Sequence, residues 1–191
     1  MQSFFHSSQY ELFFLGIEIA AALWVHIQCF EVTLRSFIHK VMSKCLTNTF
    51  WFESTKLLSK RDRTDIQRLR SRYRLQGSSA EEIVEHLSLS FWVELCSARY
   101  YEKIWRKMEE ANPLLKGKRR DFYNKAREIR NLRNSIAHHG PIMRRNLIRD
   151  HAFLGELTAI LDPELAREVE KRSRVLDLLL NARLVGSGGG I

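Results

Sequence analysis

The sequence predicts an all-α protein, and three observations support this. The 191 residues include only 3 Pro and 9 Gly, so helix breakers are scarce along most of the chain. Apolar residues recur at three-to-four spacing over long stretches. No alternation of apolar and polar residues extends beyond a few positions, as a half-buried strand would require. We therefore expect helix in at least roughly 60% of the chain.

The first half of the chain is expected to hold three helical segments. Residues 10–46 contain no Pro and predict one long helix. Ser79 and Glu82 have the spacing of a capping box, which opens a short helix through residue 87. Residues 88–108 keep the helical pattern, and a Pro soon after them ends it.

The second half is expected to hold three more. The predicted helices cover residues 118–137, 145–161 and 163–183. Gly140 and Pro141 follow the first of these and predict a flexible C-cap and a stop. Asp162 and Pro163 fit the N-cap and the first position of the last helix. The Gly-rich residues 184–191 are expected to form a flexible tail.

Positive charge is concentrated in two segments of this chain, whose net charge is +9. Residues 61–74 carry six Arg against two Asp, and residues 116–133 carry eight cations against two acids. Such segments favour a polyanionic partner, although a solvated helix face has the same composition. The candidate RNA-binding residues are Arg61, Arg63, Arg68, Arg70, Arg72, Arg74, Lys118, Arg119, Arg120, Arg127 and Arg130.

Residues 12–30 are apolar enough to raise the question of a membrane span. Glu18 lies near their middle, and a carboxylate at mid-bilayer costs about 2.5–3.5 kcal/mol. A core helix or a dimer-interface helix has the same composition. We therefore expect no stable membrane association, and a membrane-anchored effector stays as a third hypothesis.

The three Cys are widely spaced and form no Cys-x-x-Cys pair. This spacing predicts neither a zinc site nor a disulfide framework. We expect no cofactor, no metal ligands beside the motif described next, and a cytoplasmic protein.

The end of the predicted helix 118–137 carries residues suited to RNA cleavage. Asn134 and His138 are four positions apart and share one helix face, while Arg133 has a long side chain one position before Asn134. His is suited to proton transfer near neutral pH, and Arg grips phosphate oxygens and stays charged. These three side chains are expected to converge on one phosphate. A His at this position is also often only a helix cap that donates hydrogen bonds to free carbonyl groups.

Residues 132–142, which contain this motif, resemble the signature of the Abi-like (abortive infection) proteins, a branch of the HEPN superfamily. That family's nuclease motif is Arg-Asn-x-x-x-His, matched here by Arg133, Asn134 and His138. Three further segments resemble family blocks in the same order. They are residues 30–39, 87–93 and 149–151.

The resemblance implies a HEPN-like helical bundle with a long N-terminal helix and a C-terminal helical extension. It implies a single domain over residues 1–183 with a core at about 30–161. The implied function is that of a metal-independent endoribonuclease, an abortive-infection or toxin effector in antiphage defence whose composite site forms in a homodimer. The alternative is an RNA-binding module that holds a small non-coding antitoxin RNA without cleaving it.

Other residues near these blocks have two interpretations each. His139 could assist His138, but we favour a helix cap. Glu31 and Arg35 could be auxiliary groups, since the family's first helix lies near its motif helix, or they could form an intrahelical pair. Trp92 and Trp105 could stack on bases, but their apolar surroundings favour the core.

Overall fold

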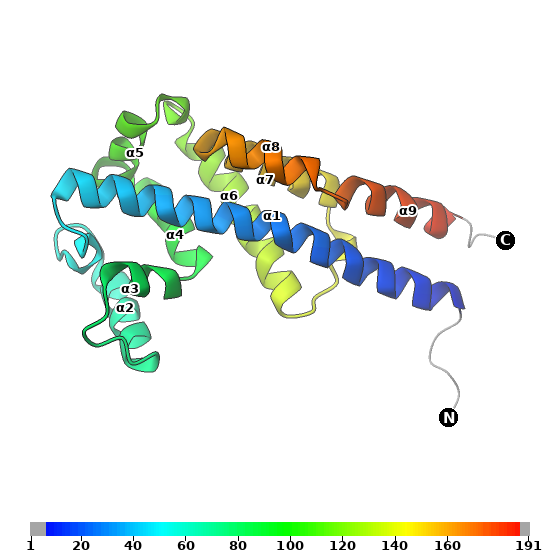
Figure 1. The fold of residues 1–191 in the computed structure, drawn as a ribbon, viewed down its shortest axis with the longest axis horizontal. Coiled ribbons are helices and arrows are strands. Elements are labelled where there is room, and N and C mark those ends of the chain that lie inside the picture. The colour runs from blue at the N-terminus through cyan, green and yellow to red at the C-terminus, as the bar shows by residue number, and fades with distance from the viewer. Residues whose placement is uncertain (1–6, 188–191) are drawn as a thin grey trace. The chain divides into compact units, whose positions relative to one another are not determined.

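The computed structural model describes residues 7–187, which are 80% helical and contain no strand (Figure 1). The all-α prediction is therefore confirmed. The helices are α1 (Ser7–Leu46), α2 (Lys60–Arg72), α3 (Ala80–His86), α4 (Leu89–Leu95), α5 (Arg106–Ala111), α6 (Arg119–Ala137), α7 (Leu147–Leu161), α8 (Pro163–Lys171) and α9 (Val175–Ser187). α1, α6 and α7 agree with the predicted helices to within three residues.

Two predicted helix starts are confirmed by their hydrogen bonds. Before α3, Ser79 Oγ accepts from the Glu82 amide at 3.2 Å, and the Glu82 carboxylate accepts from the Ser79 amide at 3.1 Å. Before α8, Asp162 Oδ1 accepts from the Leu165 amide at 2.9 Å, with Pro163 at the first helical position. Each cap satisfies amide groups that have no partner inside the helix.

The single helix predicted over 88–108 is wrong. The structure has α4, a 3-10 turn, a π-helical turn (Tyr101–Trp105) and α5 in this segment. Ser88 and Ser97 have extended backbone, with ψ of 157° and 165°. Neither serine side chain forms a hydrogen bond that caps the helical turn after it, so the hydroxyl groups do not explain the breaks. Apolar spacing alone missed these breaks.

The helix predicted over 163–183 is divided as well. α8 ends at Lys171 and α9 begins at Val175, whose amide donates to Ser173 Oγ at 3.4 Å. No Gly or Pro marks this break, so local sequence patterns did not predict it. α9 also continues to Ser187, beyond the predicted end at residue 183, and the remaining tail residues 188–191 lie outside the described part of the chain.

The chain divides into two compact units. Unit 1 comprises Met1–Phe30 and Glu128–Ile191, and unit 2 comprises Glu31–Arg127. The predicted core at about 30–161 coincides with neither unit, and the single-domain organisation stays a prediction. The motif Arg133, Asn134 and His138 belongs to unit 1.

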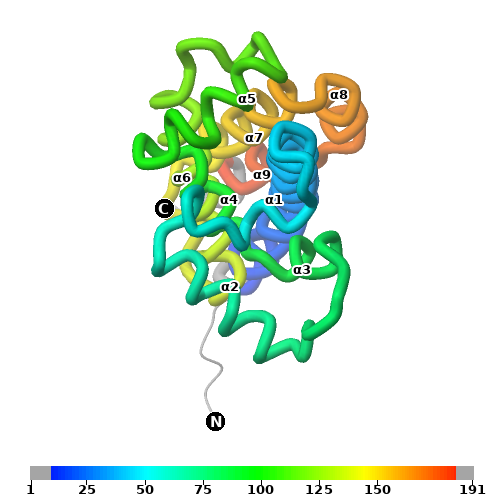
Figure 2. Tube along the Cα trace, turned by 90° about the vertical axis from the view of Figure 1, so that its left-hand side faces the viewer, coloured from blue at the N-terminus to red at the C-terminus, as the bar shows by residue number. Residues whose placement is uncertain are grey.

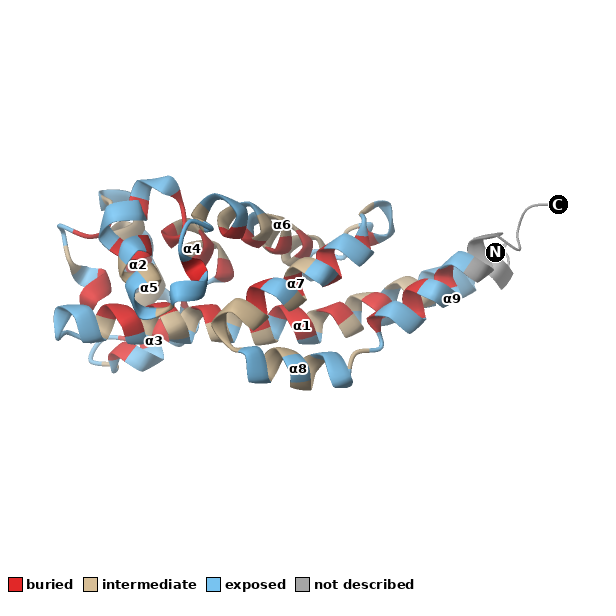
Figure 3. Cartoon of the chain, turned by 90° about the horizontal axis from the view of Figure 1, so that it is seen from above, coloured by how far each residue is buried: buried red, intermediate tan, exposed pale blue. Residues whose placement is uncertain are grey.

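Unit 1 is built on the apolar faces of α1 and α7. Ile19, Leu23 and Ile27 on α1 are at most 1% exposed, and so are Leu154 and Leu157 on α7. Such side chains contribute about 1.5–3 kcal/mol each when fully buried. α7 packs against α8 and α9 (Figure 2). α8 has no fully buried residue, in contrast to α1, where buried and exposed positions alternate (Figure 3).

Unit 2 has an aromatic core. Trp51, Trp92 and Trp105 are all 0% exposed, and the rings of Trp51 and Trp92 have centroids 6.3 Å apart. Trp92 Nε1 donates to the Leu87 carbonyl at 3.2 Å. The expectation that Trp92 and Trp105 belong to the core is confirmed, and neither is available to stack on a base.

The apolar helix α1 meets the length and composition of a membrane span. Over Tyr10–Leu46 its most apolar 18-residue window has a mean hydropathy of 1.7, and 22% of that window is buried. Phe13, Phe14 and Val25 are more than half exposed. One such helix is a weak indication, because core helices of soluble proteins meet the same criteria. The absence of stable membrane association therefore stays a prediction.

Candidate functional site

The predicted motif lies at a helix C-terminus with a defined backbone geometry. After α6 ends at Ala137, the His139 amide donates to the Ile136 carbonyl at 3.1 Å, and the Gly140 amide donates to the Ser135 carbonyl at 2.7 Å. These two bonds form a Schellman motif. They hold His138 at a fixed point just beyond the last helical residue.

The prediction that Gly140 supplies the C-cap is corrected in one respect. The left-handed position is occupied by His139, whose φ is +55°. A side chain in this conformation costs about 1–2 kcal/mol relative to glycine. Gly140 is favoured for another reason, since a Cβ there would lie 3.2 Å from the Ser135 carbonyl oxygen, a tight contact with the backbone. The favoured interpretation of His139 as part of the cap agrees with this geometry.

His138 and Asn134 are linked by a backbone hydrogen bond, and their side chains make no polar contact with other described residues. The His138 amide donates to the Asn134 carbonyl at 3.0 Å, which places the two residues one turn apart. The His138 side chain is exposed and that of Asn134 is half-buried. Within the described part of unit 1, neither side chain takes part in a hydrogen bond or ion pair. Both are therefore available to a ligand.

Arg133 is held by an aromatic ring. Its Cζ lies 5.7 Å from the centroid of the Trp24 ring, and both residues belong to unit 1. This cation–π contact contributes about 0.5–2 kcal/mol. The Arg133 Nε is buried and has no hydrogen-bond partner among the described residues, and no described carboxylate pairs with the guanidinium. A cation that is positioned but not neutralised favours an anionic ligand.

Trp24 is a residue that sequence reasoning missed. It lies in the apolar stretch 12–30, where an aromatic side chain has the same pattern as any core residue. No local spacing relates it to Arg133, which is more than a hundred residues away along the chain. The contact depends on the packing of α1 against α6.

An ion-pair network holds the segment that follows the motif. Arg145 Nε donates to the fully buried Asp150 at 2.8 Å, and its Nη2 lies 3.2 Å from the Glu128 carboxylate. Arg149 Nη2 lies 3.8 Å from Glu128 and 3.7 Å from Asp150. Glu128 belongs to α6 and Asp150 to α7, so the network ties the motif helix to the next helix.

Two of the three predicted auxiliary residues, Glu31 and Arg35, belong to unit 2. Arg35 Nη1 donates to the Glu85 carbonyl at 3.2 Å, which anchors α1 to α3. Glu31 is half-buried on the preceding turn of α1. A role for Glu31 or Arg35 beside the motif therefore stays a prediction.

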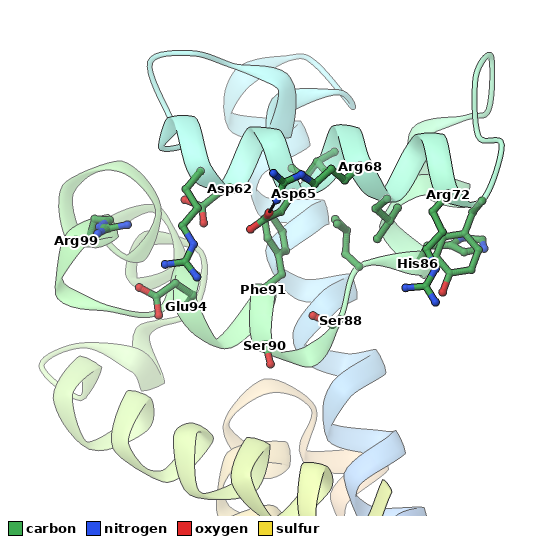
Figure 4. Close-up of a pocket in the computed structure, with 15 residues that line it drawn as sticks. Asp62, Asp65, Arg68, Arg72, His86, Ser88, Ser90, Phe91, Glu94 and Arg99 are labelled. Carbon is green, nitrogen blue, oxygen red and sulfur yellow. Dashed lines mark hydrogen bonds and ion pairs between the residues drawn. The ribbon is translucent and has the colours of Figure 1, made fainter. Parts of the chain in front are cut away.

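Three of the predicted RNA-binding arginines, Arg61, Arg68 and Arg72, line one groove in unit 2. This groove lies between α2 and α4, with a volume of about 650 Å³ (Figure 4). A fourth arginine of the groove, Arg99, was not among the predicted residues. The acids Asp62, Asp65 and Glu94 also line it, and Asp65 pairs with Arg68 at 3.4 Å. Tyr73 and Phe91 add aromatic surface. Cations beside aromatic rings are typical of grooves that bind single-stranded nucleic acid.

The remaining predicted cations have different surroundings. Arg63 and Arg70 line a second cavity, where Arg70 pairs with Glu53. Arg119 donates to the Cys96 carbonyl at 3.5 Å, and Arg127 lies over the Tyr123 ring at 5.7 Å. The other four are exposed or half-buried, without an assigned contact: Arg74, Lys118, Arg120 and Arg130.

Comparisons with known proteins add no assignment to this geometry. No family model matches the chain, no curated protein matches it, and no solved structure matches it. The interpretation of the site therefore depends on the residues themselves and on the resemblance of the motif.

Proposed function

We propose that this chain is a metal-independent endoribonuclease of the HEPN kind that acts as an abortive-infection or toxin effector in antiphage defence. The observation that carries the proposal is the end of α6. It presents an exposed His138 one turn from Asn134. Next to them is Arg133, which lies over the Trp24 ring and has no counterion among the described residues.

These three side chains have the properties that cleavage by the neighbouring hydroxyl needs. The 2′-oxygen attacks phosphorus as it loses its proton, and the 5′-oxygen leaves as it gains one. An imidazole transfers such protons near neutral pH. The guanidinium of Arg133 stabilises the extra negative charge on the phosphorus oxygens. The Asn134 carboxamide holds a phosphate oxygen or orients the imidazole. The expected products carry 2′,3′-cyclic phosphate and 5′-hydroxyl ends.

A homodimer follows from the number of proton-transferring groups. The reaction needs a base and an acid, and each chain contributes one His138, with His139 assigned to the cap in this proposal. Two copies related by a two-fold axis bring two imidazoles and two arginines to one phosphate. Exposed apolar side chains of unit 1, including Phe13, Phe14 and Leu180, offer a surface for the second copy.

The proposal is tested with purified wild-type, His138→Ala and Arg133→Ala proteins on a labelled RNA. We expect each variant to lose cleavage by about a hundred- to ten-thousand-fold, with EDTA leaving the wild-type rate unchanged. Arg144→Ala removes an exposed cation close to the motif and serves as the matched control. Full activity in His138→Ala would disprove the mechanism. Activity lost on chelation alone would replace it with a metal-dependent one.

A mixing experiment tests the composite site. Wild-type and His138→Ala chains are unfolded and refolded together, which forms mixed dimers. Because the proposed site needs the imidazoles of both chains, a mixed dimer should be inactive, and an excess of His138→Ala chains should remove most of the activity per wild-type chain. An unchanged activity per wild-type chain, with heterodimers verified, contradicts the shared site. Cleavage by a stable monomer contradicts it as well.

The alternative function, an RNA-binding module that holds a small antitoxin RNA, is favoured by the groove in unit 2. Replacing Arg68, Arg72 and Arg99 by Ala should weaken RNA binding and flatten its salt dependence. The slope of the logarithm of the binding constant against the logarithm of the salt concentration should become shallower by about 0.7 for each lost contact with a phosphate of single-stranded RNA. Arg167→Ala, an exposed cation on α8, is the control. Three results together would favour the binding module over the nuclease. RNA binds tightly, the groove variants change the salt dependence of binding, and the wild-type protein cleaves no RNA.

A further inference from the structure

Two buried histidines of unit 1 each point their Nε2 atom at the hydroxyl group of Ser173. His26 lies on α1 and His151 on α7, with ring centroids 4.6 Å apart and ring planes at 76°. His26 Nε2 lies 2.9 Å from Ser173 Oγ, and His151 Nε2 lies 3.3 Å from the same oxygen. The two side chains are only 4% and 6% exposed. They meet although 125 positions of sequence separate them.

A carboxylate completes the cluster. Glu170, in the last turn of α8, places Oε2 3.4 Å from His151 Nε2. The donor atoms offered by His26, His151 and Glu170 all lie within 4.8 Å of one another. Each residue comes from a different helix. Ser173, in the break between α8 and α9, lies within hydrogen-bond distance of both Nε2 atoms.

The two histidine rings of the cluster are unprotonated, so each has a ring nitrogen with a free electron pair. Burial lowers the pKa of His26 to about 4, with a further contribution from the neighbouring His151. Burial also lowers the pKa of His151, although Glu170 opposes this. Both rings are therefore neutral near pH 7. The Ser173 hydroxyl has one proton and can donate to only one of the two Nε2 atoms.

We propose that His26, His151 and Glu170 form a binding site for a divalent transition-metal ion of the zinc type. Two imidazole nitrogens and one carboxylate oxygen are a donor set that Zn²⁺ accepts, whereas Mg²⁺ and Ca²⁺ prefer oxygen alone. Bond lengths of about 2.0–2.2 Å place tetrahedral ligands roughly 3.4 Å apart. The 3.4 Å between His151 Nε2 and Glu170 Oε2 already fits this edge. Ser173 or a water molecule takes the fourth position.

The site has access to solvent. A cavity of about 250 Å³ is lined by His26 and Ser173, together with Glu18 and Arg172 among others. Arg172 is ion-paired with Glu168, which reduces its repulsion of a metal ion. Glu170 is itself 55% exposed and can turn toward the ion. Only small side-chain movements are needed to close the three donors around a cation.

A bound ion would join α1, α7 and α8, and it would stabilise the unit that carries the motif. None of its ligands is Arg133, Asn134 or His138, so this inference does not depend on the proposed function. Cleavage that continues in EDTA is compatible with it, provided that the temperature stays well below the midpoint of unfolding.

The test uses the full chain dialysed against EDTA and then titrated with ZnCl2. We expect one zinc ion per chain by elemental analysis. We also expect the thermal midpoint to rise by roughly 5–10 °C when zinc exceeds its Kd about a hundredfold. Glu170→Gln should weaken zinc binding at least about tenfold. Glu164→Gln, the same charge change at an exposed position in the first turn of α8, should not. MgCl2 should give no shift.

Further variants keep the test decisive. His26→Gln removes a buried ligand, and its circular dichroism shows whether the fold survives. If it folds, zinc binding should fall as in Glu170→Gln. A zinc-induced shift that is equal in wild-type and Glu170→Gln proteins would overturn the proposal. Zinc binding that disappears only in His138→Ala would place the ion at the exposed histidines, and the absence of any zinc effect would leave a hydrogen-bonded cluster only. Both outcomes also overturn it.

Discussion

Unit 1 contains two pairs of histidines with opposite properties. His138 and His139 are adjacent in sequence, and both are exposed at the end of α6. His26 and His151 are far apart in sequence, and their buried rings are in contact. The exposed pair can meet a large polymer such as RNA, whereas only a small ion or a proton can reach the buried pair.

The comparison shows that burial decides which chemical role a histidine side chain can have. An exposed imidazole keeps its rotamer freedom and exchanges protons with solvent, which suits proton transfer to a bound substrate. A buried imidazole is neutral because charging it would lose hydration, so it acts as a ligand or a hydrogen-bonding group. The first pair should therefore affect rate, and the second should affect stability and metal binding.

The largest expected effect separates these roles directly. His138→Ala should lower the cleavage rate by about a hundred- to ten-thousand-fold and change the free energy of unfolding by less than about 0.5 kcal/mol. His151→Ala should lower the free energy of unfolding by about 2–4 kcal/mol, because it leaves a cavity and removes a buried hydrogen bond. Urea denaturation and a cleavage assay on both variants provide the measurement. Equal loss of stability in the two variants would contradict the comparison.

A smaller effect is expected at Trp24, whose ring lies against the Arg133 guanidinium. Trp24→Leu removes the ring face and should lower kcat/KM by up to about tenfold, as the loss of a cation–π contact of about 1 kcal/mol implies. Trp24→Phe keeps an aromatic face and should retain most of the activity. If Leu and Phe variants lose activity equally, Trp24 acts only through packing, and circular dichroism of both would show it.

A stabilising change is expected at His139. Its φ of +55° favours glycine, but the greater backbone freedom of glycine in the unfolded chain offsets part of the gain. His139→Gly should therefore raise the free energy of unfolding by about 0.5–1 kcal/mol. Cleavage should change little if His139 is only part of the cap. A large loss of cleavage together with the gain in stability would show that this imidazole assists His138.

The smallest effect concerns a third partly buried histidine, in unit 2. Trp51 Nε1 donates to His39 Nδ1 at 3.1 Å, which requires an unprotonated Nδ1. Burial lowers the pKa of His39, and Glu81 partly opposes this. The folded state therefore binds fewer protons, so its stability is full above the unfolded pKa near 6.5 and falls as the pH drops below it. His39→Gln should remove this contribution, and unfolding followed by tryptophan fluorescence from pH 7.5 to 5 measures it.

Local patterns predicted those parts of the fold that depend on neighbouring residues. The long helix α1, the capping box at Ser79 and the start of α8 at Asp162 depend on residues within a few positions of one another, and all three are confirmed. The unbroken helices predicted over 88–108 and 163–183 were wrong. Their breaks at Ser97 and Ser173 have no Gly or Pro and depend on the surrounding packing.

The sequence by itself determined the helical class, the positive charge and the contiguous motif at the end of α6, because helix periodicity and caps involve residues close along the chain. The tertiary structure alone decided that Trp24 holds Arg133, that arginines of α2 share a groove with Arg99, and that His26, His151 and Glu170 meet. The physical reason is that side chains from separate helices are brought together by burial of apolar faces, which fixes distances that no local spacing encodes.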